Sequence, residues 1–452
     1  MDTKRYVVMG AGEVGCYLAR TLSAEGHAVT LVDDDPGKRQ IVEEQLDVRF
    51  VLGNGAHVPV LESAEVGDCD LFVAASSSDE ANLAASLLAK RLGAPRTVVR
   101  VATSEDVTKY GNRYERTFEA DLLLSTQLLT TTRILNNVAG YNTLEIEYLA
   151  RGALQVRRTH VEPGSVLHQK RLADVDLPKD CLVLAFISGS RLVVPTGEDR
   201  AQPGDDVLVL GTSDIIDEVE RRISGRSRRL GLVVIAGGGA TALTVATSLK
   251  REAKTLRIIE SDRRRAEELA ASLPDCEIIH GDATDMAALA AQGVGAAQSF
   301  IALTGHDETN LMACLLAQEL GVRHLTALVQ KSDTSTLWRK VGLLDIVSPR
   351  IVAAERIRTY IESNYEAHIL SFESGEAQFV QRRIVQESAA AGARLADIEI
   401  PQGLIVAAIL RKGRAVIPGG DDRLEAGDDV IIFVRRSEAV LAHLLFPGPD
   451  SE

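Results

Sequence analysis

An internal duplication is the feature that most limits how this chain can fold. Three pairs of segments match in the same order: 10–15 (GAGEVG) with 237–242 (GGGATA), 73–83 (VAASSSDEANL) with 301–311 (IALTGHDETNL), and 203–206 (PGDD) with 426–429 (AGDD). Each copy of a repeat is one structural unit. The sequence therefore predicts two similar halves, each made of a larger unit followed by a smaller one.

The larger unit of each half alternates short apolar runs with helical patterns. In the first half these runs are 5–9, 28–32, 48–51, 71–74 and 97–101. Strands that are apolar on both faces are typical of a parallel sheet covered by helices. The smaller unit is β-rich, with runs at 181–187, 192–194 and 207–210. We predict an α/β chain of two tandem Rossmann-like, doubly wound parallel sheets, each followed by a small β-rich α+β domain.

These patterns divide the chain into four expected domains. The Rossmann-like units are expected at 1–140 and 230–366, and the β-rich units at 141–225 and 367–452. A basic stretch, 221–229, joins the halves, and we interpret it as a solvated linker rather than a patch for phosphates or an acidic partner. Helices with apolar stripes are expected at 125–139 and 348–361. We expect them to pack against a neighbouring copy, with closure of the chain's own core as the alternative.

Charge and composition exclude several classes of protein. The formal net charge is −14, from 50 Lys and Arg against 64 Asp and Glu, which disfavours general electrostatic binding of nucleic acid or an anionic membrane. Five cysteines without a CxxC pair indicate neither a zinc site nor a disulfide framework, and they fit a reducing cytosol. The uncharged stretch 230–249 is long enough for a membrane helix, but its glycines and threonines favour a strand, a glycine turn and a helix. The N-terminus enters a strand at once, so we expect no signal peptide.

The first glycine segment has the pattern of a dinucleotide site. Gly10 permits a tight turn, Gly12 lets the backbone approach a pyrophosphate, and Gly15 allows close packing of helix on strand. Amides at the start of the helix point toward the anion. Asp33 ends the next strand, where it would bind ribose hydroxyls, and the two aspartates after it would repel a 2′-phosphate. We therefore predict that NAD(H) binds in preference to NADP(H).

The second glycine segment departs from this pattern. Gly237 and Gly239 keep the first two roles. Ala242 replaces the third glycine, and Glu260 takes the ribose position. Three arginines, 263–265, follow, and they either reach a phosphate or are solvated on the first turn of the next helix.

The halves also differ at the end of one strand. Arg100 of the first half aligns with Leu328 of the second, so the second site lacks a candidate phosphate-binding arginine. We expect a nucleotide at this site too, but its identity need not match the first.

No catalytic site is apparent in the sequence. The nine histidines form no HxxxH or HExxH motif, and there is no GxSxG motif. His306 beside Asp307 resembles an acid–base pair, but its counterpart is Ser78, which favours an ordinary loop histidine. The Asp-Glu pairs 79–80 and 307–308 stand at expected helix starts, where they would act as caps and dipole partners.

Together, the ordered duplication, GAGxVG, the acidic strand end and the SSxDExN motif resemble the KTN/RCK regulators of potassium transport. Two copies in tandem are similar to the peripheral subunit of Trk-type bacterial potassium-uptake systems. The resemblance implies NAD(H) and ATP or ADP as ligands, and gating without enzymatic activity. It also implies a homo-oligomer, a tetrameric ring, bound to an integral-membrane potassium-translocating Trk subunit. The location would be cytoplasmic, peripheral at the inner face of the cell membrane, with no nucleic-acid partner.

The family pattern also assigns nucleotide-binding residues, position by position. At the first site they are Gly10, Ala11, Gly12, Glu13, Val14, Gly15, Asp33, Asn54, Gly55, Ser76, Ser77 and Arg100. At the second site they are Gly237, Gly238, Gly239, Ala240, Thr241, Glu260, Asp282, Ala283 and Thr304. No residue is assigned a catalytic or metal-binding role.

Two other classes of function stay open. An NAD-dependent oxidoreductase acting on a small amino or keto acid would explain one glycine motif but not the second copy. A redox-sensing DNA-binding protein would need a helix-turn-helix and a basic face, and the longest basic cluster in the sequence is the linker 221–229. A hydride-transfer assay separates the oxidoreductase from a regulator.

Overall fold

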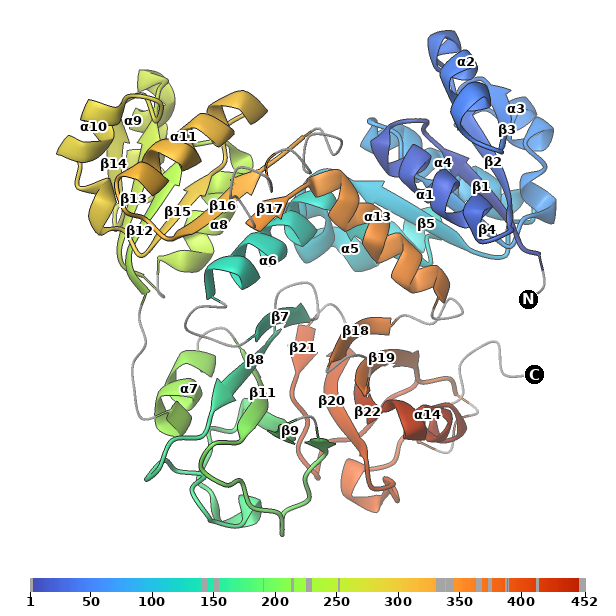
Figure 1. The fold of residues 1–452 in the computed structure, drawn as a ribbon. Coiled ribbons are helices and arrows are strands. Elements are labelled where there is room, and N and C mark those ends of the chain that lie inside the picture. Colours follow the sequence, from blue (N-terminus) through green and yellow to red (C-terminus); the bar gives the residue numbers. More distant parts are fainter. Residues whose placement is uncertain are drawn as a thin grey trace. The chain divides into compact units, whose positions relative to one another are not determined.

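In the computed structural model the chain forms two compact units (Figure 1). Unit 1 combines Met1–Val138 with Arg229–Arg358, and unit 2 combines Ala139–Arg228 with Thr359–Glu452. The structure describes residues 3–139, 145–149, 154–189, 191–212, 215–224, 230–250, 253–330, 338, 345–362, 368–372, 376–386, 388, 390–411 and 414–446. Each unit thus contains matching parts of both halves of the sequence. The finer division into four domains stays a prediction.

The first lobe of unit 1 contains a six-stranded sheet in the order β3-β2-β1-β4-β5-β6, with every pairing parallel. Its strands are β1 (Arg5–Met9), β2 (Ala28–Asp33), β3 (Arg49–Leu52), β4 (Leu71–Ala74), β5 (Thr97–Val101) and β6 (Leu122–Ser125). The five predicted strands agree with the structure to within one residue at each end. We did not predict β6, because its apolar residues run directly into the helix that follows.

Helices connect these strands. They are α1 (Glu13–Ala24), α2 (Pro36–Gln45), α3 (Val58–Ser63), α4 (Asp79–Arg91), α5 (Ser104–Phe118) and α6 (Thr126–Ala139), with a 3-10 turn at Val66–Asp68. All four residues of β4 are buried, as expected for a parallel strand covered on both faces. The strand order reverses between β1 and β4, and a ligand crevice is expected outside the carboxyl ends of the strands at such a point.

The second lobe of unit 1 repeats this sheet in the order β14-β13-β12-β15-β16-β17. Its strands are β12 (Leu230–Ala236), β13 (Ala253–Glu260), β14 (Glu277–His280), β15 (Ser299–Ala302), β16 (His324–Leu328) and β17 (Asp345–Val347). Its helices are α8 (Ala240–Leu249), α9 (Arg263–Ser272), α10 (Met286–Ala291), α11 (Asp307–Glu319) and α13 (Pro349–Glu362), with a 3-10 turn at Val294–Ala296. The uncharged stretch 230–249 is therefore strand, glycine turn and helix, as predicted. Among the described residues, no helix is long and apolar enough to cross a membrane.

Helices α6 and α13 contact each other and the opposite lobe of unit 1 (Figure 1). Arg133 of α6 forms an ion pair with Glu355 of α13 at 3.1 Å. Gln127 of α6 donates a hydrogen bond to the Thr244 hydroxyl of α8 at 3.0 Å. Apolar residues of both helices are fully buried within this one chain. For these residues the alternative to our expectation holds, because they close the chain's own core.

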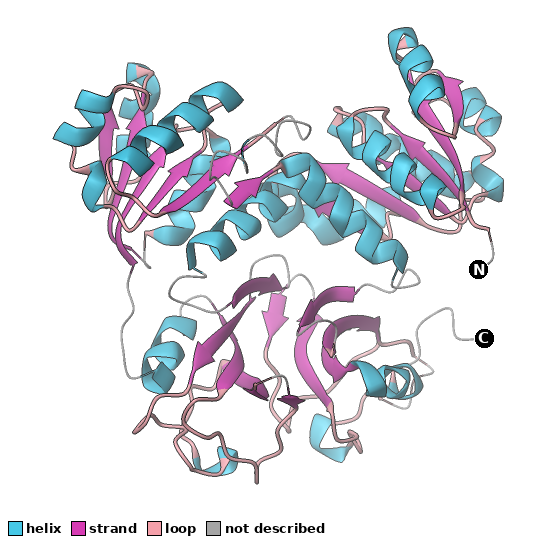
Figure 2. Cartoon of the chain, viewed as in Figure 1, coloured by secondary structure: helices cyan, strands magenta, loops and turns pink. Residues whose placement is uncertain are grey.

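Unit 2 consists mainly of strands (Figure 2). Its two antiparallel sheets have the orders β10-β9-β11-β8-β7 and β18-β19-β22-β20-β21. The first contains β7 (Glu145–Leu149), β8 (Leu154–His160), β9 (Cys181–Ser188), β10 (Arg191–Val193) and β11 (Asp206–Thr212). The second contains β18 (His368–Phe372), β19 (Ala377–Arg383), β20 (Leu404–Arg411), β21 (Arg414–Val416) and β22 (Asp429–Arg435). The helices are α7 (Ile216–Ser224) and α14 (Ala439–Leu445), with 3-10 turns at Leu172–Asp174, Leu395–Asp397 and Arg436–Glu438.

The two sheets of unit 2 share one apolar core. Leu154 and Leu208 of the first sheet belong to the same buried cluster as Phe379 and Phe433 of the second. The two phenylalanine rings lie 5.0 Å apart, centroid to centroid, at an angle of 59°. Each sheet therefore covers an apolar face of the other, which explains how such small units exclude water. Of the expected linker 221–229, the first four residues belong to α7 and the rest lie outside the described residues.

Candidate nucleotide-binding sites

The first glycine segment forms the turn between β1 and α1. Gly10 has a φ of +103°, and a Cβ there would lie 2.8 Å from the backbone of Ser76. A Cβ at Gly15 would collide with the carbonyl oxygen of Gly10. At Gly12, in contrast, no protein atom lies within 4 Å of the Cβ position. Gly10 and Gly15 are thus required by the protein's own packing, whereas the open space at Gly12 suits an approaching phosphate at a helix start.

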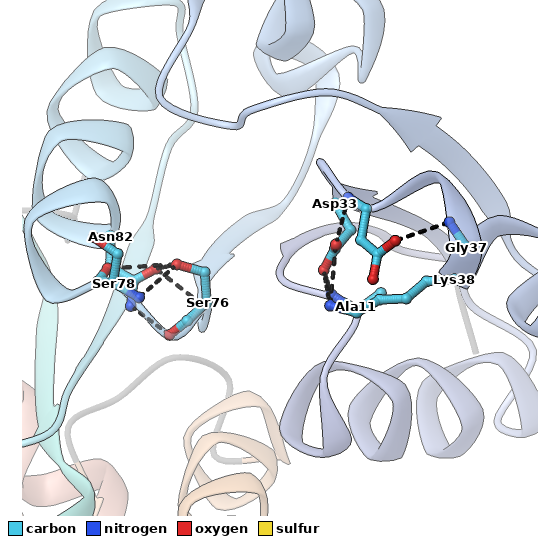
Figure 3. Close-up of polar contacts among 8 residues, drawn as sticks. Ala11, Asp33, Gly37, Lys38, Ser76, Ser78 and Asn82 are labelled. Atoms are coloured by element: carbon cyan, nitrogen blue, oxygen red, sulfur yellow. Dashed lines mark hydrogen bonds and ion pairs between the residues drawn. The ribbon is translucent and has the colours of Figure 1, made fainter.

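The carboxylate of Asp33 accepts several hydrogen bonds at the first site (Figure 3). It is 8% exposed, and it accepts hydrogen bonds from the amides of Ala11 at 2.6 Å and Asp35 at 3.0 Å. The Lys38 ammonium lies 2.9 Å and 3.1 Å from its two carboxylate oxygens. Burial alone would raise the pKa of Asp33, but these hydrogen bonds outweigh it and hold the pKa below its usual value.

Lys38 was missed in the sequence analysis. It is the third residue of α2, and Arg265 is the third residue of α9. A cation therefore follows the acidic strand end at the same place in both halves. Extending the alignment of the two copies through these helices would have identified it.

Asn82 connects the carboxyl ends of β4 and β5 (Figure 3). Its Oδ1 accepts from the amide and the hydroxyl of Ser76 at 2.9 Å and 2.7 Å. Its Nδ2 donates to the carbonyls of Ser76 at 3.0 Å and Arg100 at 2.9 Å. Asn310 makes the same four bonds in the second lobe, where Thr304 replaces the serine. The two asparagines therefore fix the shape of the strand ends at both sites. In the sequence they are noticed only as part of the motif in 73–83 and 301–311.

Arg100 extends from β5 toward the same edge. Its Nε donates to the Thr126 hydroxyl at 2.9 Å, and one terminal nitrogen donates to the carbonyl of Ser76 at 2.7 Å. Burial lowers the pKa of Arg100, Asp79 opposes this effect, and the nearby cation Arg350 adds to it. The guanidinium is thus already tied to the backbone beside the glycine turn.

The remaining first-site predictions fall in three environments. Asn54 accepts a hydrogen bond from the amide of Ala56 at 2.8 Å in an exposed turn after β3, and Gly55 is buried next to it. Val14 is 5% exposed, so its side chain belongs to the core and only its backbone is available to a ligand. Ser77 is exposed.

The second site is a cleft of about 550 Å³. Seven predicted residues line it: Gly237, Gly238, Gly239, Glu260, Asp282, Ala283 and Thr304. Ala240 and Thr241 form the start of α8. As at Gly12, no protein atom lies within 4 Å of a Cβ placed on Gly239. The structure thus brings the predicted residues of this site together, and their role in binding stays a prediction.

Two acidic side chains accept hydrogen bonds from the backbone around the second cleft. Glu260 accepts hydrogen bonds from the amides of Gly238 at 2.5 Å and Asp262 at 2.8 Å. Asp282 accepts from the amide and hydroxyl of Thr284 at 2.8 Å and 2.7 Å, and these bonds lower its pKa. Asp282 therefore repeats the turn that Asn54 makes in the first half.

The three arginines of α9 behave differently. The side chains of Arg263 and Arg264 are 80% and 91% exposed and pair with glutamates of their own helix. Arg265 also pairs with a glutamate of the helix, Glu268, at 3.0 Å, but it lines the cleft as well, and its Nε donates to the carbonyl of Gly238 at 2.8 Å. His306 also lines the cleft and is exposed. Of the two alternatives for 263–265, solvation fits the first two residues, whereas Arg265 lines the cleft, and its contact with a phosphate stays a prediction.

The Asp-Glu pairs stand in the first turns of α4 and α11, where they suit the helix dipole as expected, but the N-cap positions belong to Ser78 and His306, so the expectation that the pairs act as caps is wrong. Asp79 also accepts a hydrogen bond from the amide of Ala102, and Asp307 accepts one from the amide of Gln330, both at 2.8 Å. These aspartates therefore hold the neighbouring loops. Within the described part of the chain, no group of three or more His, Cys, Asp or Glu residues is placed to hold a metal ion.

Comparison with known proteins identifies the family. The TrkA-N domain matches residues 6–120 and 233–349, and the TrkA-C domain matches 157–224 and 379–444. The "Trk system potassium uptake protein TrkA homolog" of Archaeoglobus fulgidus is 30% identical over 436 residues, covering 96% of this chain and 98% of that protein. The "Trk system potassium uptake protein TrkA" of Haemophilus influenzae is 27% identical over 439 residues, covering 95% of each.

Solved structures share the fold. The GsuK channel bound to NAD has a TM-score of 0.58 and 20% identity, covering 98% of this chain and 79% of that chain. The GsuK RCK domain has a TM-score of 0.57 and 19% identity, covering 98% of this chain and 95% of that chain. The matched domains account for most of the sequence and alternate in the order of the duplication. The chain belongs to the TrkA family, and it carries two TrkA-N and two TrkA-C domains.

Proposed function

We propose that this chain is the nucleotide-binding regulatory subunit of a Trk-type potassium transporter, and that it gates transport through a ligand-dependent conformational change. The observation that carries the proposal is the pair of glycine turns, open at Gly12 and Gly239, in a chain whose relatives are named potassium uptake proteins. In this proposal the nucleotide is a signal and not a substrate.

The first site is proposed to bind NAD(H). The space at Gly12 would take the pyrophosphate, and Asp33 would bind the ribose. A solved relative of the same fold is described as bound to NAD, which supports this choice. The second site is proposed to take a nucleotide too, with ATP or ADP as the candidates besides NAD(H). The second site has Leu328 in the place of Arg100, and Arg265 would supply the positive charge there.

The partner is proposed to be the integral-membrane, potassium-translocating Trk subunit, contacted from the cytoplasmic side of the membrane. Several copies of the chain, four in the arrangement that the resemblance implies, would form a homo-oligomeric ring. Light scattering on the complex co-purified with its membrane partner measures the number of copies. A complex with a single copy would contradict the ring.

A switch of this kind requires unequal affinity. A ligand shifts a conformational equilibrium only if it binds the two conformations differently. A coupling of ~1–3 kcal/mol corresponds to about 5–150-fold in affinity. The backbone amides at Gly12 and at the start of α1 would bind a diphosphate tightly in one conformation and weakly in the other.

Potassium flux through the reconstituted membrane partner tests the proposal. We expect NADH and ATP to change the flux with the wild-type chain. Gly12→Val should abolish the response to the first-site ligand, and Gly239→Val the response to the second. Flux that ignores both ligands would contradict regulation, and steady consumption of NADH with a small amino or keto acid would favour the oxidoreductase.

Lys38 gives a separate prediction on cofactor choice. With Lys38→Met, the ribose hydroxyls would reach Asp33 without displacing an ammonium group, while a 2′-phosphate would meet a carboxylate that has lost its counter-ion. We expect the preference for NAD(H) over NADP(H) at the first site to rise by about tenfold, from a Coulomb change of ~1–2 kcal/mol. Calorimetry with both cofactors in a Gly239→Val background measures this ratio.

The control for this prediction is Arg39→Met. Arg39 is the next residue of α2 and pairs with Glu43 on the exposed face, away from Asp33. It should leave the ratio unchanged. A preference that falls in Lys38→Met would mean that the lysine repels NADP(H), contrary to our interpretation.

A further inference from the structure

A cation from the second half of the chain reaches the first glycine turn. Arg350 is the second residue of α13, and it forms an ion pair with Glu13, the first residue of α1. The two residues lie 337 positions apart in the sequence, in the two lobes of unit 1. The side chains are 41% and 33% exposed, so the pair lies at a partly open rim.

Glu13 places a carboxylate on the first turn of α1. A carboxylate on the first turn of α1 is close to where a diphosphate would bind, and it repels such a ligand. One of its oxygens, Oε2, is buried without a hydrogen-bond partner. The carboxylate is therefore only partly satisfied, and its other oxygen, Oε1, pairs with Arg350. Without Arg350 the entrance to the first site would carry an uncompensated negative charge.

Arg350 also lies within electrostatic range of Arg100. The two cations repel each other, and this repulsion contributes to the lowered pKa of Arg100. Arg100 is held at the backbone of Ser76, which itself borders Gly10 of the glycine turn. Two guanidinium groups from different lobes therefore flank the glycine turn, and an anion between them would relieve their repulsion.

We propose that Arg350 is a ligand-binding residue of the first nucleotide site, and that its guanidinium moves from Glu13 to the diphosphate of a bound nucleotide. The inference rests on the proposed function, because it assumes a nucleotide at the glycine turn. It adds that the first TrkA-N domain is completed by a side chain of the second. A ligand bound at the first site would then contact α13 directly, through Arg350.

The repeat supplies an internal comparison. Gln127 is the second residue of α6, and so it occupies in the first half the place of Arg350 in the second. It reaches across in the same way, and bonds to Thr244 of α8 beside the second glycine turn. The exchange between lobes is thus reciprocal, but only the contact to the first site brings a charge. The substitution Arg350→Gln gives the second half the residue that the first half already has at this position.

Calorimetry on the full chain in a Gly239→Val background tests this proposal, with NADH, ADP and adenosine as probes. Because a hydrogen bond between charged groups is lost, Arg350→Gln should weaken ADP and NADH roughly tenfold. Adenosine, which has no phosphate, should change less than about twofold. Glu13→Gln should tighten ADP, because the repelling carboxylate is gone. The matched control is Arg133→Gln, which breaks the ion pair between α6 and α13 away from the site and should leave all three affinities unchanged.

The outcomes distinguish a failure of nucleotide binding at the first site from a failure of the role of Arg350. If the wild-type first site binds none of the probes, the proposed nucleotide function fails. If it binds them and Arg350→Gln binds ADP equally well, the role of Arg350 is overturned alone. An equal loss for ADP and adenosine would also overturn it, because it would mean that Arg350 only supports the fold. Weaker ADP binding by Glu13→Gln would mean that the intact ion pair is needed, which contradicts the exchange of partners.

Discussion

Replacing Gly12 by valine is expected to remove nucleotide binding at the first site while the protein stays folded. Gly12 has φ −86° and ψ −171°, an extended conformation that valine adopts without strain. No protein atom lies within 4 Å of its Cβ position, so the new side chain would occupy only space left for a ligand. We expect the affinity for NAD(H) to fall at least 100-fold, about 2.7 kcal/mol, with a change in stability of less than about 1 kcal/mol.

The structure provides two controls for this result. Gly239→Val should remove binding at the second site and leave NAD(H) binding at the first, since Gly239 has the same open surroundings. Gly15→Ala should instead unfold the turn, because its Cβ would collide with the carbonyl oxygen of Gly10. Calorimetry and thermal unfolding distinguish the two kinds of loss. If Gly12→Val binds NAD(H) as the wild type does, the pyrophosphate does not lie at this turn.

Much of the fold followed from local pattern. The strands of the first lobe were predictable because parallel strands that are buried on both faces have sequences of short, continuous apolar runs. The duplication then gave the second lobe and the order of the β-rich units. The strand β6 was missed because Ser125 both ends it and precedes α6, with no turn residue between them. A pattern without a break does not reveal where strand becomes helix.

The features missed at the sites depend on residues that are distant in sequence. Lys38 contacts Asp33 only because the turn into α2 brings it back over the strand end. Arg350 reaches Glu13 across two lobes. The shared core of unit 2 joins sheets whose sequences are far apart. A single sequence contains the chemistry of these side chains, but their proximity is a property of tertiary packing.

The second large effect is expected at Asn82, where exchanging one amide for a carboxylate should destabilise the first lobe. Asn82 is fully buried, and its Nδ2 donates to two backbone carbonyls, those of Ser76 and Arg100. Asn82→Asp keeps the size and shape of the side chain but replaces Nδ2 by an oxygen. The two hydrogen bonds that Nδ2 donates become repulsive contacts between that oxygen and the carbonyl oxygens of Ser76 and Arg100. We expect a loss of about 3 kcal/mol, because a charge is buried with one of its oxygens facing two backbone carbonyls, although the other oxygen keeps its bonds to Ser76.

Hydrogen exchange on peptides of β4 and β5 measures this loss, because it reports the opening of one lobe, and β15 and β16 of the second lobe serve as reference. The single tryptophan lies in the second half and would not report on the first lobe. Burial raises the pKa of the new carboxyl above its unfolded value, so the folded state binds a proton more tightly than the unfolded state. The variant should therefore be least impaired near pH 4 and lose stability as the pH rises toward 7.

The control makes the same chemical change where the structure tolerates it. Asn54 uses its Oδ1 only as an acceptor, in an exposed turn, and the second half already has Asp282 in that place with the same bond. Asn54→Asp should change stability by less than about 0.5 kcal/mol. If both substitutions cost the same, the four bonds of Asn82 do not hold the strand ends. If only Asn82→Asp opens β4 and β5, the donated bonds fix the edge on which Ser76 and Arg100 meet the glycine turn, and nucleotide affinity at the first site should fall with them.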